Sequence, residues 1–303
     1  MKTTNVSDTG RYLDPALVST LQGLDLKAKM IVEGFLLGLH KSPYHGFSIE
    51  FSQHRPYQLG DDLKNVDWKV YGKTERFYVK QYEEETNLRS YIVLDSSKSM
   101  GFKYLGSITK FEYGSYLAAA LAYLMTDQKD AVGLTLFDSA IRLQMPPKAN
   151  QNYLREILKA LQAAKPQNTT ATDVALYSVA EEMQRRGLVI IISDFLDKPT
   201  SLVNALKHFR FKKSEVLCFH ISDPAEMNLG FEHDSMFVDL ETNEEMSVLP
   251  HQLRKDYKNA VNEHLDYLKK QCSDYGIEFT MLSTATPFDT ALITYLQKRM
   301  RLS

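Results

Sequence analysis

The chain is poor in cysteine, in net charge and in long apolar runs, and each shortage excludes a class of protein. Only Cys218 and Cys272 occur among 303 residues, so a disulfide scaffold is excluded and reduced thiols are expected. The formal net charge of -2 removes the general positive field that binders of nucleic acid or anionic membranes use. The most apolar early segment, 30–39, contains Glu33 and is far shorter than the roughly 20 residues of a membrane-spanning helix.

The first ten residues are polar and lack the apolar stretch of a signal peptide. We therefore expect a soluble cytoplasmic protein that neither inserts into a membrane nor binds nucleic acid.

What is present is typical of a folded α/β protein. Hydrophobic residues make up 44% of the sequence and charged residues 24%, which is ordinary for globular domains. Short, nearly unbroken apolar runs read as strands that are covered on both faces. They lie at 91–94, 131–137, 188–192, 216–221 and 277–282. Helical patterns separate them, and this alternation predicts a doubly wound, mostly parallel sheet with right-handed crossovers.

The helices between these strands have recognisable starts and apolar stripes. Thr109 and Glu112 have the spacing of a capping box, and an apolar stripe that suits a helix covering the sheet follows them. Further helices are expected at 152–161, 173–186, 201–209, 252–272 and 288–299.

The region before residue 89 has a different pattern. Apolar residues recur at helical spacing over 14–40, with Gly23 and Gly38 as interruptions, and the segments 47–51 and 76–84 alternate like strands. We therefore expect two parts: residues 1–88 as a helical and β extension packed on the main domain, and residues 89–303 as the main α/β domain.

Oxygen-bearing side chains follow the predicted strands at their carboxyl ends, where doubly wound sheets bind ligands. Asp95, Ser97 and Ser99 follow the first strand of the main domain, and Asp194 follows the strand at 188–192. Such groups suit a hard cation such as Mg²⁺. An Asp followed by two serines also fits a polar turn that caps a helix, and Lys98 would oppose a cation unless it points to solvent.

The order and spacing of these residues resemble the metal-ion-dependent adhesion site of von Willebrand factor type A domains. That family has a threonine followed after a short gap by Ala-Leu, and Thr170 with Ala175 and Leu176 fits this register. The alternatives in the same loop are Thr169 and Thr172. The glycines that usually precede the threonine are replaced by Asn168 and Thr169.

The upstream sequence narrows the match, because it resembles a bacterial family called domain of unknown function family 58. The residues that carry this resemblance are Gly46, Arg55, Tyr57, Gly60, Asp61, Asp62, Asp67, Trp68, Lys80, Tyr82 and Glu83. Members of the family are often encoded beside MoxR-type AAA ATPases. The resemblance therefore implies a partnership with such an ATPase.

The resemblance implies one divalent cation, Mg²⁺ with Mn²⁺ or Ca²⁺ as alternatives, and a metal-free version of the site is the other reading. The implied ligands are Asp95, Ser97, Ser99, Thr170 and Asp194. A cation held mainly by neutral hydroxyls keeps much of its charge, so it can capture an acidic group of a partner.

The sequence offers little that would turn such a cation to catalysis. No positioned base or nucleophile stands out beside it, and the phosphate-loop and nucleophile-elbow motifs do not occur. We therefore expect a non-enzymatic interaction module. The alternative is a metal-dependent hydrolase or phosphotransferase that uses the same ion.

Overall fold

The computed structural model describes residues 13–41, 55–56, 72, 77–79, 88–169, 171–231, 235–239 and 244–301. The chain divides into two compact units, one of Met1–Gly38 with Asn87–Ser303 and one of Leu39–Thr86. The N-terminal residues up to Gly38 thus group with the sheet-bearing unit, whereas the sequence had assigned residues 1–88 to one extension.

The described elements of the smaller unit are two short antiparallel strands, β1 (Arg55–Pro56) and β2 (Tyr78–Val79). The strand predicted at 47–51 lies outside the described residues, as does most of the strand predicted at 76–84.

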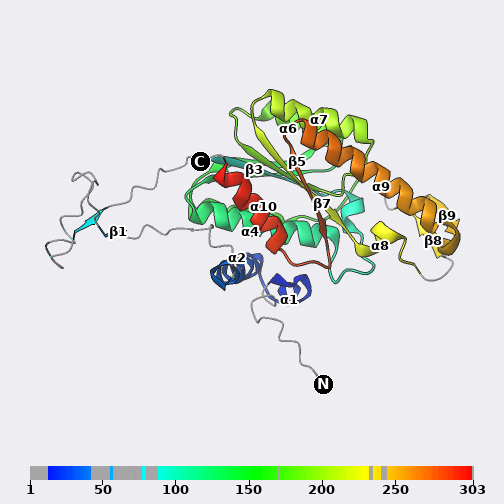
Figure 1. The fold of residues 1–303 in the computed structure, drawn as a ribbon, viewed down its shortest axis with the longest axis horizontal. Coiled ribbons are helices and arrows are strands. Elements are labelled where there is room, and N and C mark those ends of the chain that lie inside the picture. Colours follow the sequence, from blue (N-terminus) through cyan, green and yellow to red (C-terminus); the bar gives the residue numbers. More distant parts are fainter. Residues whose placement is uncertain are drawn as a thin grey trace, which may run out of the picture. The chain divides into compact units, whose positions relative to one another are not determined.

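A six-stranded sheet forms the centre of the larger unit (Figure 1). Its strands, in sequence order, are β3 (Arg89–Asp95), β4 (Ala131–Phe137), β5 (Ile141–Lys148), β6 (Leu188–Ser193), β7 (Glu215–Ser222) and β10 (Glu278–Ser283). In space they run β10-β7-β6-β3-β4-β5, and every neighbouring pair is parallel except β4 with β5. The predicted doubly wound, mostly parallel sheet is confirmed.

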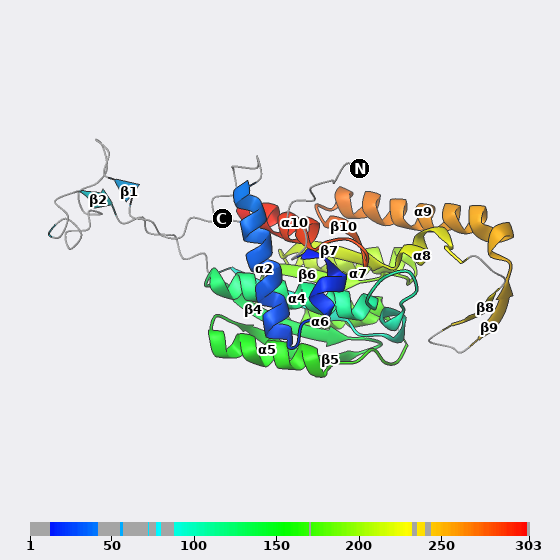
Figure 2. The ribbon, with the colours of Figure 1, turned by 90° about the horizontal axis from the view of Figure 1, so that it is seen from below.

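Helices cover both faces of this sheet, which is why its central strands are apolar on both sides. All residues of β6 are buried. One face carries α4 (Lys110–Asp127), α5 (Gln151–Ala163) and α10 (Asp289–Met300); the other carries α6 (Thr172–Glu182), α7 (Pro199–Phe211) and α9 (Pro250–Asp274) (Figures 1 and 2).

Two N-terminal helices, α1 (Pro15–Ser19) and α2 (Leu24–Lys41), belong to the same unit. Gly23 separates them with a φ of 83°, a left-handed conformation that favours glycine. The interruption predicted at Gly38 is wrong, because α2 continues to Lys41. Among the described residues, no helix has both the length and the apolar character needed to cross a bilayer.

Some elements were not predicted from the sequence. Strand β5 contains Pro146 and Pro147, which suit its position at the sheet edge because a proline there interrupts no interior ladder. Gly133 on β4 allows the close approach of β5, since a Cβ at this position would lie 2.5 Å from the Met145 carbonyl oxygen. The short hairpin of β8 (Ser235–Val238) and β9 (Glu245–Val248) was also missed.

The strand order reverses between β3 and β6. From β3 the chain continues outward through β4 and β5, whereas β6, β7 and β10 extend the sheet on the other side. Doubly wound sheets bind ligands at this switch point, outside the carboxyl ends of the strands. The ends of β3 and β6 therefore define where a site is expected.

Candidate metal centre

Asp95 is the last residue of β3, and its carboxylate is fully buried at the switch point. One carboxylate oxygen accepts a hydrogen bond from the Ser97 backbone N–H at 2.9 Å. The other accepts from the Ser193 hydroxyl at 2.7 Å. The end of β6 thus holds the carboxylate at the end of β3 in a fixed orientation.

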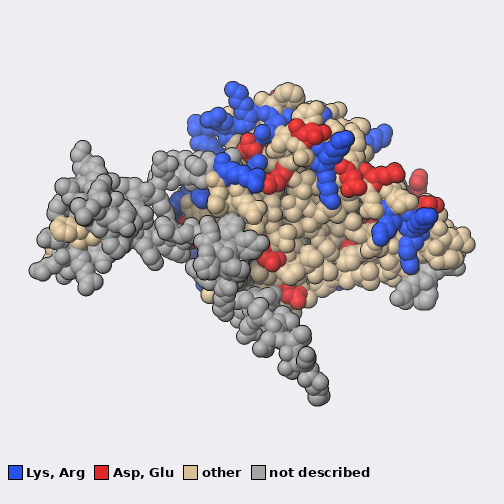
Figure 3. Space-filling model, in the orientation of Figure 1, with Lys and Arg blue, Asp and Glu red and all other residues tan. Residues whose placement is uncertain are grey.

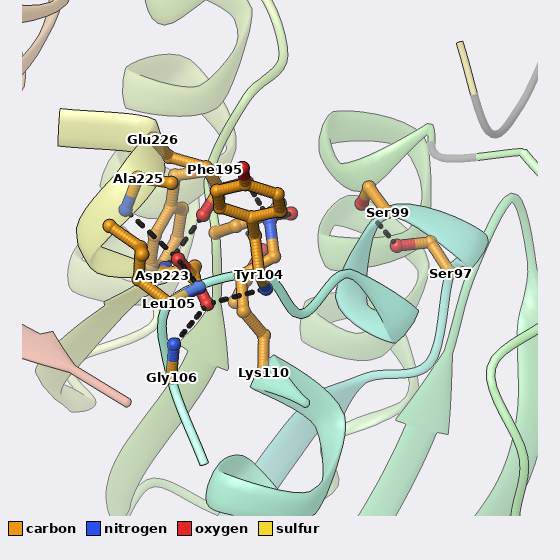
Figure 4. A network of polar contacts seen from close by, with 12 residues as sticks. Ser97, Ser99, Tyr104, Leu105, Gly106, Lys110, Phe195, Asp223, Ala225 and Glu226 are labelled. Carbon is orange, nitrogen blue, oxygen red and sulfur yellow. Dashed lines mark hydrogen bonds and ion pairs between the residues drawn. The ribbon is translucent and has the colours of Figure 1, made fainter. Parts of the chain in front are cut away.

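Ser97 and Ser99 stand at the start of a single 3₁₀ turn, η3 (Lys98–Gly101). Their hydroxyl oxygens lie 3.0 Å apart, and Figure 4 shows them facing one another. Ser97 is fully buried and Ser99 is partly exposed, while Lys98 between them is exposed to solvent. The exposure of Lys98 keeps its ammonium group out of the protein interior.

The threonine loop is hydrogen-bonded to the serine turn. The Gln167 N–H donates to the Ser96 carbonyl and the Lys98 N–H donates to the Asn168 carbonyl, at 2.9 and 3.0 Å. Asn168 has a φ of 61°. Asparagine tolerates this left-handed conformation better than most residues, which explains how it can stand where the resembled family has glycine.

Thr170 itself lies outside the described residues, so its assignment as a ligand stays a prediction. Thr172, one of the alternatives, is described. Its backbone N–H donates to Asp197 at 2.8 Å. Its hydroxyl is buried and has no hydrogen-bond partner within the described part of the chain.

Asp194 follows β6 and is 2% exposed. One of its carboxylate oxygens accepts a hydrogen bond from the Lys110 ammonium at 2.7 Å. The other is buried and lacks a partner among the described residues. Lys110 also donates to Glu226 at 2.6 Å, so one buried ammonium joins two carboxylates (Figure 4).

Charge is unevenly distributed in this cluster. Burial and the nearby Asp194 carboxylate raise the pKa of Asp95 to about 7, although hydrogen bonds from Ser193 and Ser97 act against the shift. Burial opposes protonation of Lys110, but Asp194 and Glu226 hold its pKa above the usual range. The Lys110 ammonium pairs with Asp194 and Glu226, and Asp95 adds a third carboxyl group close to Asp194, so carboxyl groups outnumber the cation in this cluster.

The residue after Asp194 is held in an uncommon backbone conformation. Phe195 is fully buried and has a φ of 47°, which is uncommon for a bulky residue and is typically found at functional sites. Its N–H donates to the Ser193 hydroxyl at 3.0 Å. Ser193 therefore accepts from this turn and donates to Asp95, which links the two aspartate loops.

Asp223, which directly follows β7, has a structural role. It accepts backbone hydrogen bonds from Tyr104, Leu105 and Gly106 at 2.9 to 3.0 Å, and it caps α8 (Pro224–Asn228) (Figure 4). Burial acts to raise the pKa of Asp223, but these donors hold it below its usual range. The carboxylate thus fixes the loop after the serine turn.

The residues present fit a divalent cation. The paired serine hydroxyls and the unpartnered oxygen of Asp194 are hard oxygen donors, and a divalent cation would offset the excess of carboxyl groups over the single ammonium. Within the described ranges no group of three or more His, Cys, Asp or Glu side chains could hold a metal. Hydroxyl oxygens would therefore have to complete the ligand set.

Lys110 and Glu226 were not predicted from the sequence as part of the site, whereas Ser193 belongs with Asp194 to the pattern that resembles the adhesion site but was not predicted as a ligand. Lys110 lies in the first turn of a helix, where a lysine reads as a solvated side chain. Its partner Glu226 is 116 positions away along the chain. Ser193 did carry a signal, because it directly precedes Asp194 at the end of the most apolar strand.

The fold and this cluster define a class: a doubly wound α/β protein with a polar, negatively charged centre at its topological switch point. Residues 53–267 match the family described as Protein of unknown function DUF58. The chain belongs to this family, which confirms the resemblance seen in its sequence.

Named relatives and solved structures add likeness but no assigned activity. The uncharacterized protein Rv1480 of Mycobacterium tuberculosis is 26% identical over 95% of this chain and 91% of its own length. The conserved hypothetical protein BatB from Bacteroides thetaiotaomicron has a TM-score of 0.49 at 16% identity, covering 71% of this chain and 100% of BatB. The SpRpn10 VWA domain has a TM-score of 0.39 at 12% identity, covering 69% of this chain and 95% of that domain.

Proposed function

We propose that this chain is a non-enzymatic protein-interaction module that captures an acidic side chain of a partner through one divalent cation, Mg²⁺ in the first place. The proposed ligands are Asp95, Ser97, Ser99, Thr170 and Asp194. The observation that carries the proposal is that three carboxyl groups, those of Asp95, Asp194 and Glu226, share a single ammonium beside paired serine hydroxyls at the switch point. A bound cation would supply a Lewis-acidic position that accepts a carboxylate.

The chain's own residues would determine how strongly the cation attracts that carboxylate. Lys110 already compensates one oxygen of Asp194, so this aspartate transfers less negative charge to a metal. Neutral serine hydroxyls transfer less still. A metal held in this way keeps a high affinity for an added anion, which favours binding of a partner.

The surface around the centre also favours a protein partner. Exposed apolar side chains follow each group of proposed ligands along the chain. Tyr104 and Leu105 follow the serine turn, Val174 lies in the first turn of α6, and Leu196 comes two residues after Asp194. These four side chains are 51%, 55%, 58% and 62% exposed. Apolar side chains around a central polar contact are typical of protein interfaces.

Titration calorimetry tests the metal assignment. Mg²⁺ or Mn²⁺ should bind the wild-type protein with one site per chain, and Asp95→Ala should abolish binding while the protein stays folded. Asp266→Ala is the matched control, because Asp266 is exposed on α9. Unchanged Mg²⁺ binding in Asp95→Ala would refute the assignment.

The partner is proposed to be a MoxR-type AAA ATPase, working with the chain in protein maturation or complex assembly. The support for this partner is that the chain belongs to the DUF58 family, whose members are often encoded beside such ATPases. A pull-down with such an ATPase should recover a complex that is weakened by EDTA and by Asp95→Ala. A complex insensitive to both changes would contradict capture through the metal.

A further inference from the structure

A groove lies between α2, α4 and α5, beside the serine turn but separate from the proposed ligand set. Its volume is about 800 Å³, within the range of roughly 300–1,000 Å³ that is typical of ligand pockets. The described residues that line it include Lys27, Lys98, Ser115, Tyr116, Leu161 and Pro166. All of them belong to the larger unit.

Lys27 is the unusual feature of this groove. The residue is 9% exposed, and its ammonium donates hydrogen bonds to the Ser19 carbonyl at 3.0 Å and to the Tyr116 hydroxyl at 2.7 Å. The same ammonium lies 4.2 Å from the centre of the Tyr116 ring. Among the described residues no carboxylate pairs with it.

A buried ammonium without a counter-charge is costly, and it has a third N–H to donate. Neutral oxygens and an aromatic ring reduce this cost without removing the charge. A carboxylate that entered the groove would add a charge-assisted hydrogen bond. The groove is therefore electrostatically complementary to an anion.

The rest of the lining favours a segment with apolar residues beside the anion. Leu21, Leu24, Phe111, Leu161 and Pro166 supply apolar surface. Among the described lining residues Glu112 is the acid, and its carboxylate is engaged by the capping box with Thr109. The buried Ser115 hydroxyl has no partner among the described residues and adds an unused polar group.

We infer that this groove binds a peptide segment of a partner protein, in which an Asp or Glu carboxylate is flanked by apolar residues. The carboxylate accepts the remaining N–H of Lys27, and the flanking residues pack on the walls from α4 and α5. No metal takes part in this contact. The inference therefore stands independently of the proposed cation site.

The position of the groove gives it a place in a larger interface. Lys98 lines its mouth and stands between Ser97 and Ser99. If the proposed metal centre also binds a carboxylate of the partner, a single partner covers the groove and the metal centre with neighbouring segments. The groove then contributes affinity that EDTA does not remove.

Fluorescence anisotropy with defined peptides tests the inference. The probes are fluorescein-labelled octapeptides with one central Glu flanked by Leu, Phe and Pro, and matched peptides with Gln in place of Glu. Measured in EDTA on the full chain, Glu peptides should bind at least tenfold more tightly than Gln peptides. Equal binding of the two sets, or no binding of either, would overturn the proposal.

Variants identify the groove as the place of binding. Lys27→Met should weaken binding of the Glu peptides at least tenfold, and Lys27→Arg should largely restore it. Lys29→Met is the matched control, because Lys29 is exposed on the same helix and paired with Glu33. Gln162→Trp obstructs the groove from an exposed lining position, so it should weaken binding even if Lys27→Met does not fold. Wild-type affinity in Gln162→Trp would contradict the inference, as would wild-type affinity in a folded Lys27→Met.

Discussion

Two buried lysines lie at helix α4 in different surroundings: Lys110 is the first residue of the helix, and Lys27 of α2 contacts Tyr116 on it. The Lys110 ammonium lies between the carboxylates of Asp194 and Glu226, at 2.7 and 2.6 Å. Within the described part of the chain, the partners of the Lys27 ammonium are the Ser19 carbonyl and Tyr116, which offers both its hydroxyl and its ring. The first lysine is an internal counter-ion of the candidate metal centre, whereas the second is the residue that we propose to bind a ligand's anion.

The largest expected effect is a difference in unfolding free energy between variants of the two lysines. Lys110→Met leaves the buried Asp194 carboxylate and the partly buried Glu226 carboxylate uncompensated, so the free energy of unfolding should fall by about 3–5 kcal/mol. Lys27→Met removes a buried charge that has no counter-ion among the described residues, so its unfolding free energy should stay within about 1 kcal/mol of the wild type. Urea denaturation of both variants measures the difference. Equal losses would show that the two lysines have the same structural role.

Ser193→Ala sharpens the description of the metal centre. The Ser193 hydroxyl donates to Asp95 and accepts from the Phe195 N–H, and both groups are buried. Its removal should lower the free energy of unfolding by about 2 kcal/mol and raise the pKa of Asp95 further. Urea denaturation gives the first result, and Mg²⁺ titration at pH 7 should show weaker binding. An unchanged Mg²⁺ affinity would mean that Asp95 is not a ligand or that Ser193 does not orient it.

The pH dependence of Mg²⁺ binding follows from the raised pKa of Asp95, about 7 against an ordinary 3.8. Protons compete with the metal below this pKa, so Mg²⁺ affinity should rise about tenfold between pH 6 and pH 8. In the metal-free protein the sign is opposite. The native state holds this proton more tightly than the unfolded state, so Asp95's contribution to stability is present below about pH 4 and is lost as pH rises through about 7.

Calorimetry at a series of pH values measures the first effect. Asp266→Ala is the control, because its Mg²⁺ affinity should follow the wild-type pH profile. A flat profile would show that the metal does not displace a proton from Asp95.

The smallest expected effect belongs to Lys98, which is exposed beside the serine turn. Removing its charge by Lys98→Ala should strengthen Mg²⁺ binding about twofold, because exposed charges interact weakly through water. The gain should disappear at 1 M salt. A large, salt-independent gain would instead indicate that Lys98 occupies the centre directly.

Much of the fold was readable from the sequence because its central strands are covered on both faces. The apolar runs of β6 and β7 and the capping box at Thr109 are local signals, and the structure confirms them. Strand β5 was not predicted, because it combines two prolines with an alternating pattern of partly buried and exposed residues at the sheet edge. Its close approach to β4 depends on Gly133 in that strand, and the residue pattern of β5 itself does not show this contact.

The candidate site was readable only in part. The motif predicted that Asp95, Ser97 and Ser99 would share one turn after a strand, and this turn is present. The link from Asp95 to Ser193 spans 98 positions, and the pairing of Lys110 with Glu226 depends on how α4 and α8 meet. Such pairings come from tertiary packing, so a single sequence does not reveal them.

The most direct test of the central claim is an anomalous difference map from a crystal grown with Mn²⁺. The account predicts one manganese peak at the ends of β3 and β6, within roughly 2.0–2.6 Å of hydroxyl oxygens from the serine turn. Lys110 should remain paired with Asp194 and Glu226, and one coordination position should face the surface. A well-ordered centre without manganese, or with the ion bound elsewhere, would contradict the account.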